Sequence, residues 1–233
     1  MSEPISANAD ALTISVVIPA LNEAARIADA VQSSFAAGGD EVIVADGHSD
    51  DATEAVAARA GAVVVRSARG RGTQIRSGVA ATRGDIVVVL HADNRLAEHC
   101  LDELRVAPER LPRWWGGLNQ TIDDRRWIYR LVEWGNRCRI QWWGVVLGDQ
   151  ALFVSRELLR RVGGYADVPL LEDVELSRRL RRVSRPTLMP GPVMVDARRW
   201  KRRGVIRQTL LNWKILALYR FGYDETALAK LYR

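Results

Sequence analysis

A short apolar run near the middle of the chain constrains the fold most. Ile86 to Leu90 are five consecutive apolar residues, rich in β-branched side chains, and they lead directly into His91, Ala92 and Asp93. The run lacks the alternation of a half-exposed strand and is too short for a helix, so it predicts a central parallel strand. Polar groups at the carboxyl end of such a strand lie where open α/β sheets bind ligands.

The first third of the chain repeats this pattern. Apolar runs over 13–20, 41–47, 62–67 and 85–93 predict strands, and the segments between them predict helices over 23–35, 52–60 and 72–82. This alternation predicts right-handed crossovers and a mostly parallel α/β sheet. Further on, the patterns predict helices over 126–139, 171–183 and 205–221, and a strand followed by a helix within 148–165.

Composition and charge narrow the class of protein. With 48% apolar and 27% charged residues among 233, the chain is globular. No signal segment or run of eighteen apolar residues occurs, so we expect a cytoplasmic protein. In that reducing compartment we expect Cys100 and Cys138 to be free thiols, and we assign them no role. Residues 1–100 carry 8 Lys and Arg against 13 Asp and Glu, whereas residues 101–233 carry 26 against 15. Such a basic half suits nucleic acid, anionic lipid or phosphorylated substrates alike.

The ends of the first two predicted strands carry polar residues. Pro19, Asn22 and Glu23 follow the first strand, where Asn22 and Glu23 also suit a helix cap and first turn. Asp46 and Gly47 end the second strand; a carboxylate there can accept hydrogen bonds from a ribose hydroxyl or a base edge.

A second set of residues suits simpler structural roles as well. Asp51 and Glu54 match a helix capping box. Arg69 and Arg71 lie among glycines before a helix, where backbone amides and guanidinium groups can meet phosphate oxygens, although a surface turn would look similar.

The remaining candidates follow later strands and helices. Asp93 offers a hard oxygen ligand for a divalent cation that bridges a diphosphate, while His91 suits either the ligand or the core. Glu172 and Asp173 are adjacent carboxylates at a predicted helix start, which is also a common helix feature. Trp200 stands among arginines in "DARRWKRRG", which suits a phosphate, a stacked ring or a solvated loop.

In order along the chain, these segments resemble a family 2 glycosyltransferase with the GT-A fold. The resemblance covers about residues 13–233 and is strongest to a small bacterial group associated with arsenosugar biosynthesis or carotenoid-acid glycosylation, through "HAD", "GDQALFV", "LLEDVELSRRL" and "ARRW". It implies a tail over 1–12 and one domain over 13–233, with a nucleotide-binding half (13–96) and an acceptor-binding half (97–233).

The resemblance also implies roles for individual residues. Asp173 corresponds to the expected general base, with Glu172 beside it, and Asp93 to the last Asp of the DxD motif, which binds Mg²⁺ or Mn²⁺. His91 replaces the first Asp of that motif, and Asp196 stands where the QxxRW element has Gln. The expected nucleotide-binding residues are Pro19, Asn22, Glu23, Asp46, Gly47, Arg69, Arg71, Gln74, His91 and Ala92. The expected acceptor or diphosphate residues are Gly148, Asp149, Gln150, Arg199 and Trp200.

The implied activity is an inverting transfer of one hexose from a nucleotide diphosphate sugar, with UDP as the expected nucleotide, to a small or lipid-like acceptor. We expect no nucleic-acid partner; a peripheral membrane contact at the inner membrane face and a homodimer stay open. Two other classes compete. A nucleotidyltransferase is expected to have a glycine-rich first loop with a lysine, and "PALNEA" has neither feature. A non-catalytic basic module that binds nucleic acid or membrane would leave Asp46, Asp93 and Asp173 without a role.

Overall fold

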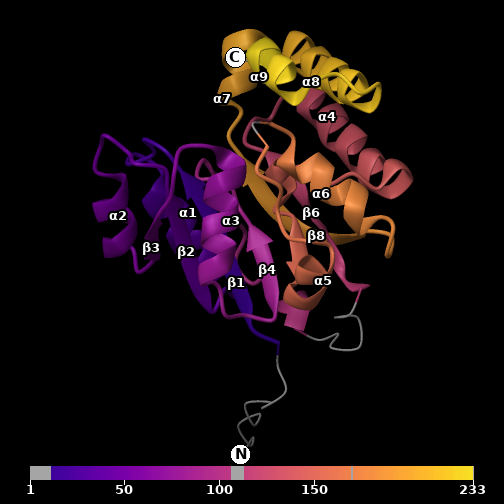
Figure 1. Ribbon diagram of the computed structural model, residues 1–233. Helices are drawn as coiled ribbons and strands as arrows, with labels where there is room; N and C mark the ends of the chain where they lie inside the picture. Colours follow the sequence, from indigo (N-terminus) through magenta and orange to yellow (C-terminus); the bar gives the residue numbers. More distant parts are fainter. Residues whose placement is uncertain (1–11, 106–112, 169, 233) are drawn as a thin grey trace, which may run out of the picture.

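One eight-stranded sheet forms the centre of the protein (Figure 1). The computed structural model describes residues 12–105, 113–168 and 170–232, so the expected tail over 1–12 lies almost wholly outside it. The strand order is β3-β2-β1-β4-β7-β6-β8-β5. The strands are β1 (Ile14–Ala20), β2 (Glu41–Asp46), β3 (Val63–Arg66), β4 (Ile86–Val89), β5 (Asn94–Leu96), β6 (Trp115–Ile122), β7 (Phe153–Ser155) and β8 (Thr187–Val195).

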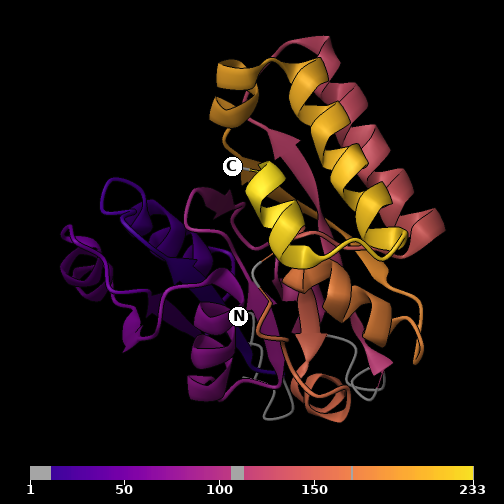
Figure 2. The same ribbon diagram turned by 45° about the horizontal axis from the view of Figure 1, so that its top comes forward.

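Helices cover both faces of the sheet and extend beyond it (Figures 1 and 2). The α-helices are α1 (Ile27–Ala36), α2 (Thr53–Arg59), α3 (Arg71–Ala81), α4 (Trp127–Cys138), α5 (Arg156–Arg161), α6 (Glu172–Leu180), α7 (Arg198–Arg203), α8 (Val205–Arg220) and α9 (Glu225–Tyr232). Shorter turns of helix are η1 (Asp102–Arg105), the π-helical η3 (Arg139–Trp143) and η4 (Gly148–Gln150).

The amino-terminal half confirms the predicted parallel α/β pattern. β1 pairs in parallel with both β2 and β4, and β2 pairs in parallel with β3. Neighbouring residues of one strand enter different cores: Val16 packs in the core that holds Ile27 of α1, and Val17 packs in the core that holds Ile75 of α3. Because both faces are covered, the strands read as continuous apolar runs.

The second half adds antiparallel pairing that the sequence did not indicate. β7 pairs antiparallel with β4 and with β6, and β5 pairs antiparallel with β8. β6 pairs in parallel with β8, with an irregular register between Leu118 and Gln120. The sheet is therefore mixed, and its α/β class agrees with the prediction.

Two local predictions at the first loops were wrong. The first helix begins at Ile27 rather than Glu23, because the chain first forms a turn in which the Glu23 carbonyl accepts from the Arg26 and Ile27 amides. Asn22 therefore does not cap it. The capping box is also absent: Asp51 accepts from the Thr53 and Ala24 amides, whereas Glu54 turns outward to Arg66.

Gly116 permits the close approach of β6 and β8. A Cβ atom on Gly116 would lie 1.8 Å from the Thr187 carbonyl oxygen. Overpacking typically costs about 1–3 kcal/mol, so we expect Gly116→Ala to lower the free energy of unfolding by at least this amount in urea titrations. Gly135→Ala is the control, because nothing lies within 4 Å of its Cβ, and a helical Ala gains about 0.5–1 kcal/mol over Gly. Equal stability of the two variants would contradict this packing argument.

Candidate active site

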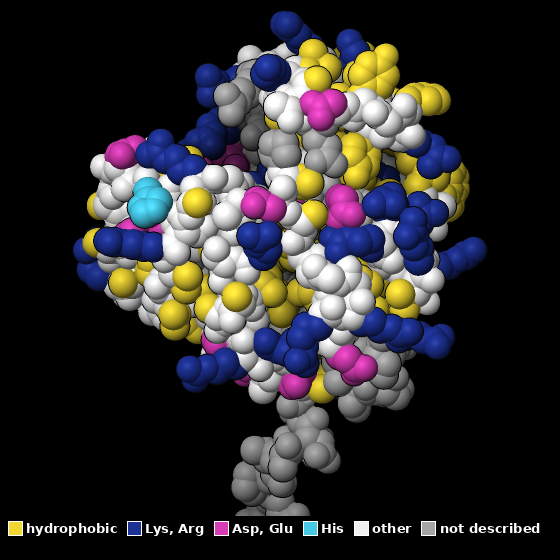
Figure 3. Space-filling view, in the orientation of Figure 1, with side chains coloured by type: hydrophobic (Ala, Val, Ile, Leu, Met, Phe, Trp, Pro, Cys, Tyr) yellow, Lys and Arg dark blue, Asp and Glu magenta, His cyan; other side chains and the backbone are white. Residues whose placement is uncertain are grey.

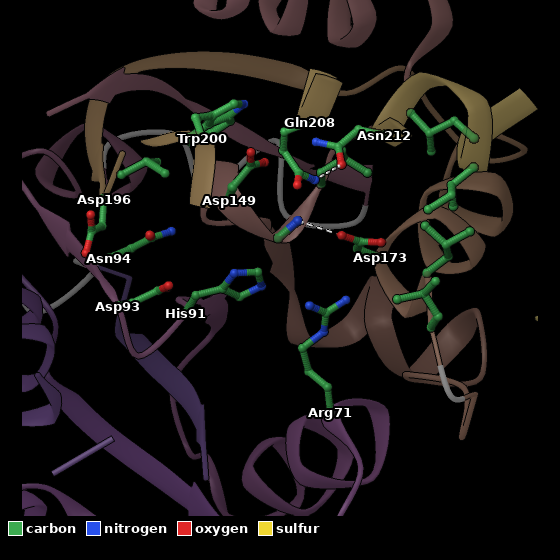
Figure 4. A pocket seen from close by; sticks show the side chains of 17 residues that line it. Arg71, His91, Asp93, Asn94, Asp149, Asp173, Asp196, Trp200, Gln208 and Asn212 are labelled. Carbon is green, nitrogen blue, oxygen red and sulfur yellow. Dashed lines mark hydrogen bonds between the residues drawn. The ribbon is translucent and has the colours of Figure 1, made fainter. Parts of the chain in front are cut away.

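A cavity of about 150 Å³ opens where the end of β4 meets η4, α6 and α8 (Figure 4). It gathers seven predicted site residues from both halves of the chain. These are Arg71, His91, Asp93, Gly148, Asp149, Asp173 and Trp200. Four carboxylates line the cavity, from Asp93, Asp149, Asp173 and Asp196, and a wall of leucine and isoleucine side chains closes one side.

A tight turn after β4 presents the "HADN" residues to the cavity. The Asn94 amide donates to the His91 carbonyl at 3.0 Å, which closes the turn and brings His91 and Asp93 to its edge. The His91 ring lies close against the backbone of Gly148, where a Cβ atom would be 2.2 Å from Nε2. Position 148 therefore needs glycine if the imidazole is to keep this place.

Asp173 is held rigidly at the start of α6. Leu171 has a left-handed backbone with φ 64°, and the chain enters α6 directly after it. The Asp173 carboxylate accepts from the Gly148 amide at 2.6 Å and from the Val174 amide at 2.7 Å. Only 7% of Asp173 is exposed, yet it lines the cavity, so its carboxylate is fixed beside the space that a substrate can enter.

The surroundings of Asp173 make it a stronger base than an ordinary carboxylate. Burial and, next, the negative charge of Glu172 raise its pKa to about 6, against the lowering effects of Arg71 and of the two backbone amides. A carboxylate tuned in this way is still ionised at neutral pH and accepts a proton more readily than a free Asp.

An ion pair joins the two halves beneath this base. Arg71 begins α3 and Glu172 begins α6; Arg71 Nε donates to Glu172 Oε1, and Nη2 donates to Oε2 at 3.2 Å. Glu172 is 1% exposed, so its charge needs this partner. Glu172 is thus ion-paired beside Asp173 and does not line the cavity, and its expected catalytic role stays a prediction.

Asp93 could serve as one ligand of a divalent cation. Arg198 Nη2 lies 4.0 Å from its Oδ2, and Glu23 is near enough that burial and then the Asp93 charge raise the Glu23 pKa. Within the described part of the chain, no group of three or more His, Cys, Asp or Glu side chains could hold a metal ion. Mg²⁺ is usually held by one or two carboxylates completed by substrate phosphates and water, and the assignment of Asp93 as such a ligand stays a prediction.

Several predicted nucleotide residues lie outside the lining of this cavity, at the ends of β1 and β2. The Asp46 carboxylate is fully buried and accepts from the Ser49 amide at 2.8 Å and from the Ser49 hydroxyl at 2.5 Å. Buried Gln74 donates to the Ala20 carbonyl at 2.5 Å and packs against Gly47. These bonds shape the loop, so contact of these two side chains with a nucleotide stays a prediction.

The outer part of the same loop is polar and open. Asn22 accepts from the Asp50 amide at 2.8 Å, and Arg69 donates to Asp50 at 2.9 Å. Pro19 is buried in β1 opposite Ala45. The structure thus brings Asn22, Pro19, Asp46 and Arg69 into one neighbourhood at the carboxyl ends of β1 and β2, as expected for an open parallel sheet.

A family model described as glycosyl transferase family 2 matches residues 15–133, which include β1 to β4 and the "HADN" turn. The chain belongs to glycosyl transferase family 2. Glucosyl-3-phosphoglycerate synthase of Mycobacterium tuberculosis (strain ATCC 25618 / H37Rv) is 43% identical over a 93-residue alignment, and the match covers 35% of this chain and 29% of the relative. The chain thus spans less than a third of that curated relative's length.

Solved structures agree with this family. The M. tuberculosis glucosyl-3-phosphoglycerate synthase in complex with Mn²⁺, UDP and glucosyl-3-phosphoglycerate has a TM-score of 0.54 at 27% identity, covering 79% of this chain and 71% of that one. Staphylococcus aureus TarS 1-349 has a TM-score of 0.60 at 12% identity, covering 95% and 69%, and shows the fold alone. These relatives are not from the arsenosugar or carotenoid-acid group, whose resemblance stays a prediction.

Some residues that line the cavity were not predicted from the sequence. Gln208 and Asn212 of α8 line the cavity, and Gln208 Nε2 donates to Asn212 Oδ1 at 2.8 Å (Figure 4). Three buried atoms of lining residues, Asn94 Nδ2, Trp200 Nε1 and Gln208 Oε1, have no hydrogen-bond partner. Their chemistry, two donors and one acceptor, suits the hydroxyl groups of a neutral ligand.

The other predicted acceptor-side residues lie at or below the cavity, apart from Arg199. Gln150 lies below the cavity, where its Oε1 accepts from buried Arg139 at 2.6 Å. Trp200 lines the cavity and packs edge to face on Tyr129, with 6.2 Å between ring centroids. Arg199 lies in α7, but its side chain is outside the described residues. Ala92 lines a neighbouring hollow with Asp93.

Proposed function

We propose that the protein transfers a single hexose from a UDP-sugar to the hydroxyl of a neutral acceptor, with inversion at the anomeric carbon. The observation that carries this proposal is the Asp173 carboxylate. It is anchored by two backbone amides, raised in pKa and exposed to the cavity that also holds Asp93. Family membership supports a glycosyl group as what is transferred.

The chain's own residues account for the chemistry of such a transfer. Asp173 accepts the proton of the acceptor hydroxyl while that oxygen attacks the anomeric carbon. The new carbon–oxygen bond forms as the bond to the diphosphate oxygen breaks, and the electron pair leaves with UDP. Asp93 would hold a divalent cation, which supplies charge neutralisation for the diphosphate when bound.

The donor part of the proposal follows from the relatives and the loop chemistry. The M. tuberculosis synthase was crystallised with UDP and with Mn²⁺ or Mg²⁺. In the present chain, Asn22, Asp46 and Arg69 surround the sheet edge where a nucleotide would lie in such a fold. A uridine nucleotide is therefore the donor we test first.

The acceptor part follows from the charge and polarity of the cavity. Among its described lining residues, Arg71 is the one Lys or Arg side chain, and it is ion-paired with Glu172. The four lining carboxylates disfavour an anionic acceptor such as the phosphoglyceric acid bound by the M. tuberculosis synthase. Leu147, Leu171 and Ile215 instead form an apolar wall. These features favour an alcohol with an apolar portion, in keeping with a lipid-like acceptor.

Transfer assays with radiolabelled UDP-glucose and Mn²⁺ test both parts. We expect labelled product with a neutral amphipathic alcohol, n-octyl β-glucoside, and at least tenfold less product with 3-phosphoglycerate. Asp173→Asn serves as the inactive control. Preferred transfer to 3-phosphoglycerate would overturn the acceptor class alone, whereas no release of UDP from any of a panel of UDP-sugars would overturn the proposed function.

A further inference from the structure

An exposed apolar surface covers two neighbouring helices on the side of the molecule away from β1 to β3. We call it the outer face; it consists of Trp127, Leu131, Trp134, Trp142, Trp143, Ile206, Leu210 and Trp213. Trp127 is 71% exposed, Trp142 75% and Ile206 66%. Large apolar side chains gathered in this way are unusual on the surface of a monomer and indicate an interaction site.

Helical spacing aligns these residues along each helix. In α4 they occur at positions 127, 131 and 134, and in α8 at 206, 210 and 213, so each set forms one stripe. α4 and α8 run side by side in both ribbon views (Figures 1 and 2). Trp143 packs edge to face on Trp213 with 5.1 Å between ring centroids, which joins the two stripes. Figure 3 shows apolar side chains over these helices with basic groups around them.

Positive charge predominates around the outer face, although Asp124 precedes α4 and Asp224 follows α8. Residues 198–223 contain eight Lys and Arg and no Asp or Glu. Exposed Arg137, Arg207, Lys214 and Arg220 border the two stripes, and none of them forms an ion pair with another described residue. The one carboxylate of α4, Glu133, is buried and accepts from the Ile122 amide and Arg130.

We propose that the outer face docks on the surface of an anionic lipid bilayer. Tryptophan prefers the boundary between headgroups and acyl chains, and Lys and Arg near it attract acidic headgroups. A second copy of this chain would bring cations against cations, so charge favours lipid over a homodimer. No described helix is long and apolar enough to cross a membrane. In the proposed docking, α4 and α8 lie along the bilayer surface.

This docking would place the proposed site beside the bilayer. The face of α8 opposite its stripe carries Gln208, Asn212 and Ile215, which line the cavity. A single helix, about 10–12 Å across with its side chains, therefore separates the cavity from the outer face. An alcohol with an apolar tail could enter from the bilayer, although the docking itself does not depend on the acceptor.

Vesicle co-sedimentation of the full chain tests the docking. We expect vesicles of 70% phosphatidylcholine and 30% phosphatidylglycerol to bind the protein at least tenfold more tightly than pure phosphatidylcholine, with a loss of binding at high salt. The variant Trp134→Ser/Leu210→Ser and the variant Arg207→Glu/Lys214→Glu should each bind the anionic vesicles at least tenfold more weakly. Matched controls are Val63→Ser, an exposed apolar residue of β3, and Arg59→Glu of α2, which should bind as the unaltered protein does.

If the outer face binds a second copy of this chain or DNA instead of lipid, the measurements should differ. Equal binding to both kinds of vesicle, or wild-type binding by both double variants, would overturn the proposal. So would a micromolar dimer that Trp134→Ser/Leu210→Ser dissociates, or tighter binding to DNA than to anionic vesicles. Circular dichroism and the thermal unfolding midpoint of each variant, measured without lipid or nucleotide, show whether it is folded and keep the test independent of the proposed activity.

Discussion

Replacement of Asp173 by asparagine is expected to lower kcat for hexosyl transfer by about 10²–10⁴-fold, the usual worth of a positioned general base. The amide has nearly the same shape, and its oxygen can still accept from the Gly148 amide. It cannot take the proton of the acceptor hydroxyl. UDP binding should change little, because Asp93, the proposed ligand of the cation that neutralises the diphosphate, is unaltered. Steady-state turnover of UDP-glucose and isothermal titration with UDP separate the two quantities.

Glu175→Gln is the matched control for this change. Glu175 lies one half-turn further along α6 and interacts with Arg178 and Arg179 rather than with the cavity. We expect its kcat to stay within about twofold, because Glu175 does not line the cavity. Unchanged turnover in Asp173→Asn, with turnover lost in Glu175→Gln, would remove Asp173 from the mechanism.

The same residue sets the expected pH dependence. A base must be ionised to act, and burial with the Glu172 charge raises the Asp173 pKa to about 6. Turnover should therefore fall about tenfold per pH unit below pH 6 and level off above it. The acid limb should move to higher pH in Arg71→Met, because the Arg71 charge lowers this pKa.

The apolar runs predicted the first half of the fold well. Ile86 to Val89 form a central strand whose two faces are both covered, so the strand is a continuous apolar run that the sequence alone reveals. β8 has no such run. Its segment "TLMPGPVMV" holds two prolines and a glycine, which argue against a central strand. β8 nevertheless lies between β6 and β5. The prolines and the glycine are tolerated because the register with β6 is irregular between Leu118 and Gln120.

The candidate site was likewise predicted only in part from the sequence. His91, Asp93 and Asp173 stand at the ends of predicted elements, where polar residues need a reason, and the structure brings them to one cavity. Gln208 and Asn212 escaped notice because apolar residues lie on both sides of α8: Leu210 faces outward, whereas Ile215 is buried together with Gln208. Periodicity finds two faces of a helix, but tertiary contacts decide which face is covered.

Asp93→Asn is expected to weaken Mn²⁺-dependent binding of UDP by at least about 10–100-fold, the range seen when groups around a metal are altered. A neutral amide is a poorer ligand for a hard cation than a carboxylate. In thermal-shift titrations, UDP with Mn²⁺ should stabilise the unaltered protein by about 2.7 kcal/mol at a hundred times its Kd. The variant should respond to UDP alone and with Mn²⁺ in nearly the same way.

Asp123→Asn is the control, since Asp123 is an exposed carboxylate of the neighbouring hollow that Asp93 also lines. Its response to Mn²⁺ should match the unaltered protein, and a matching response in Asp93→Asn would contradict the assignment. The large expected loss of Mn²⁺-dependent UDP binding in Asp93→Asn is explained by His91, which is not a carboxylate. The resemblance implies that the His91 imidazole stands where a DxD motif has its first acid, and the ring lies close against Gly148, so Asp93 is the one carboxylate of the "HADN" turn. With no second acid in the turn to compensate, removal of its charge should uncouple UDP binding from the metal.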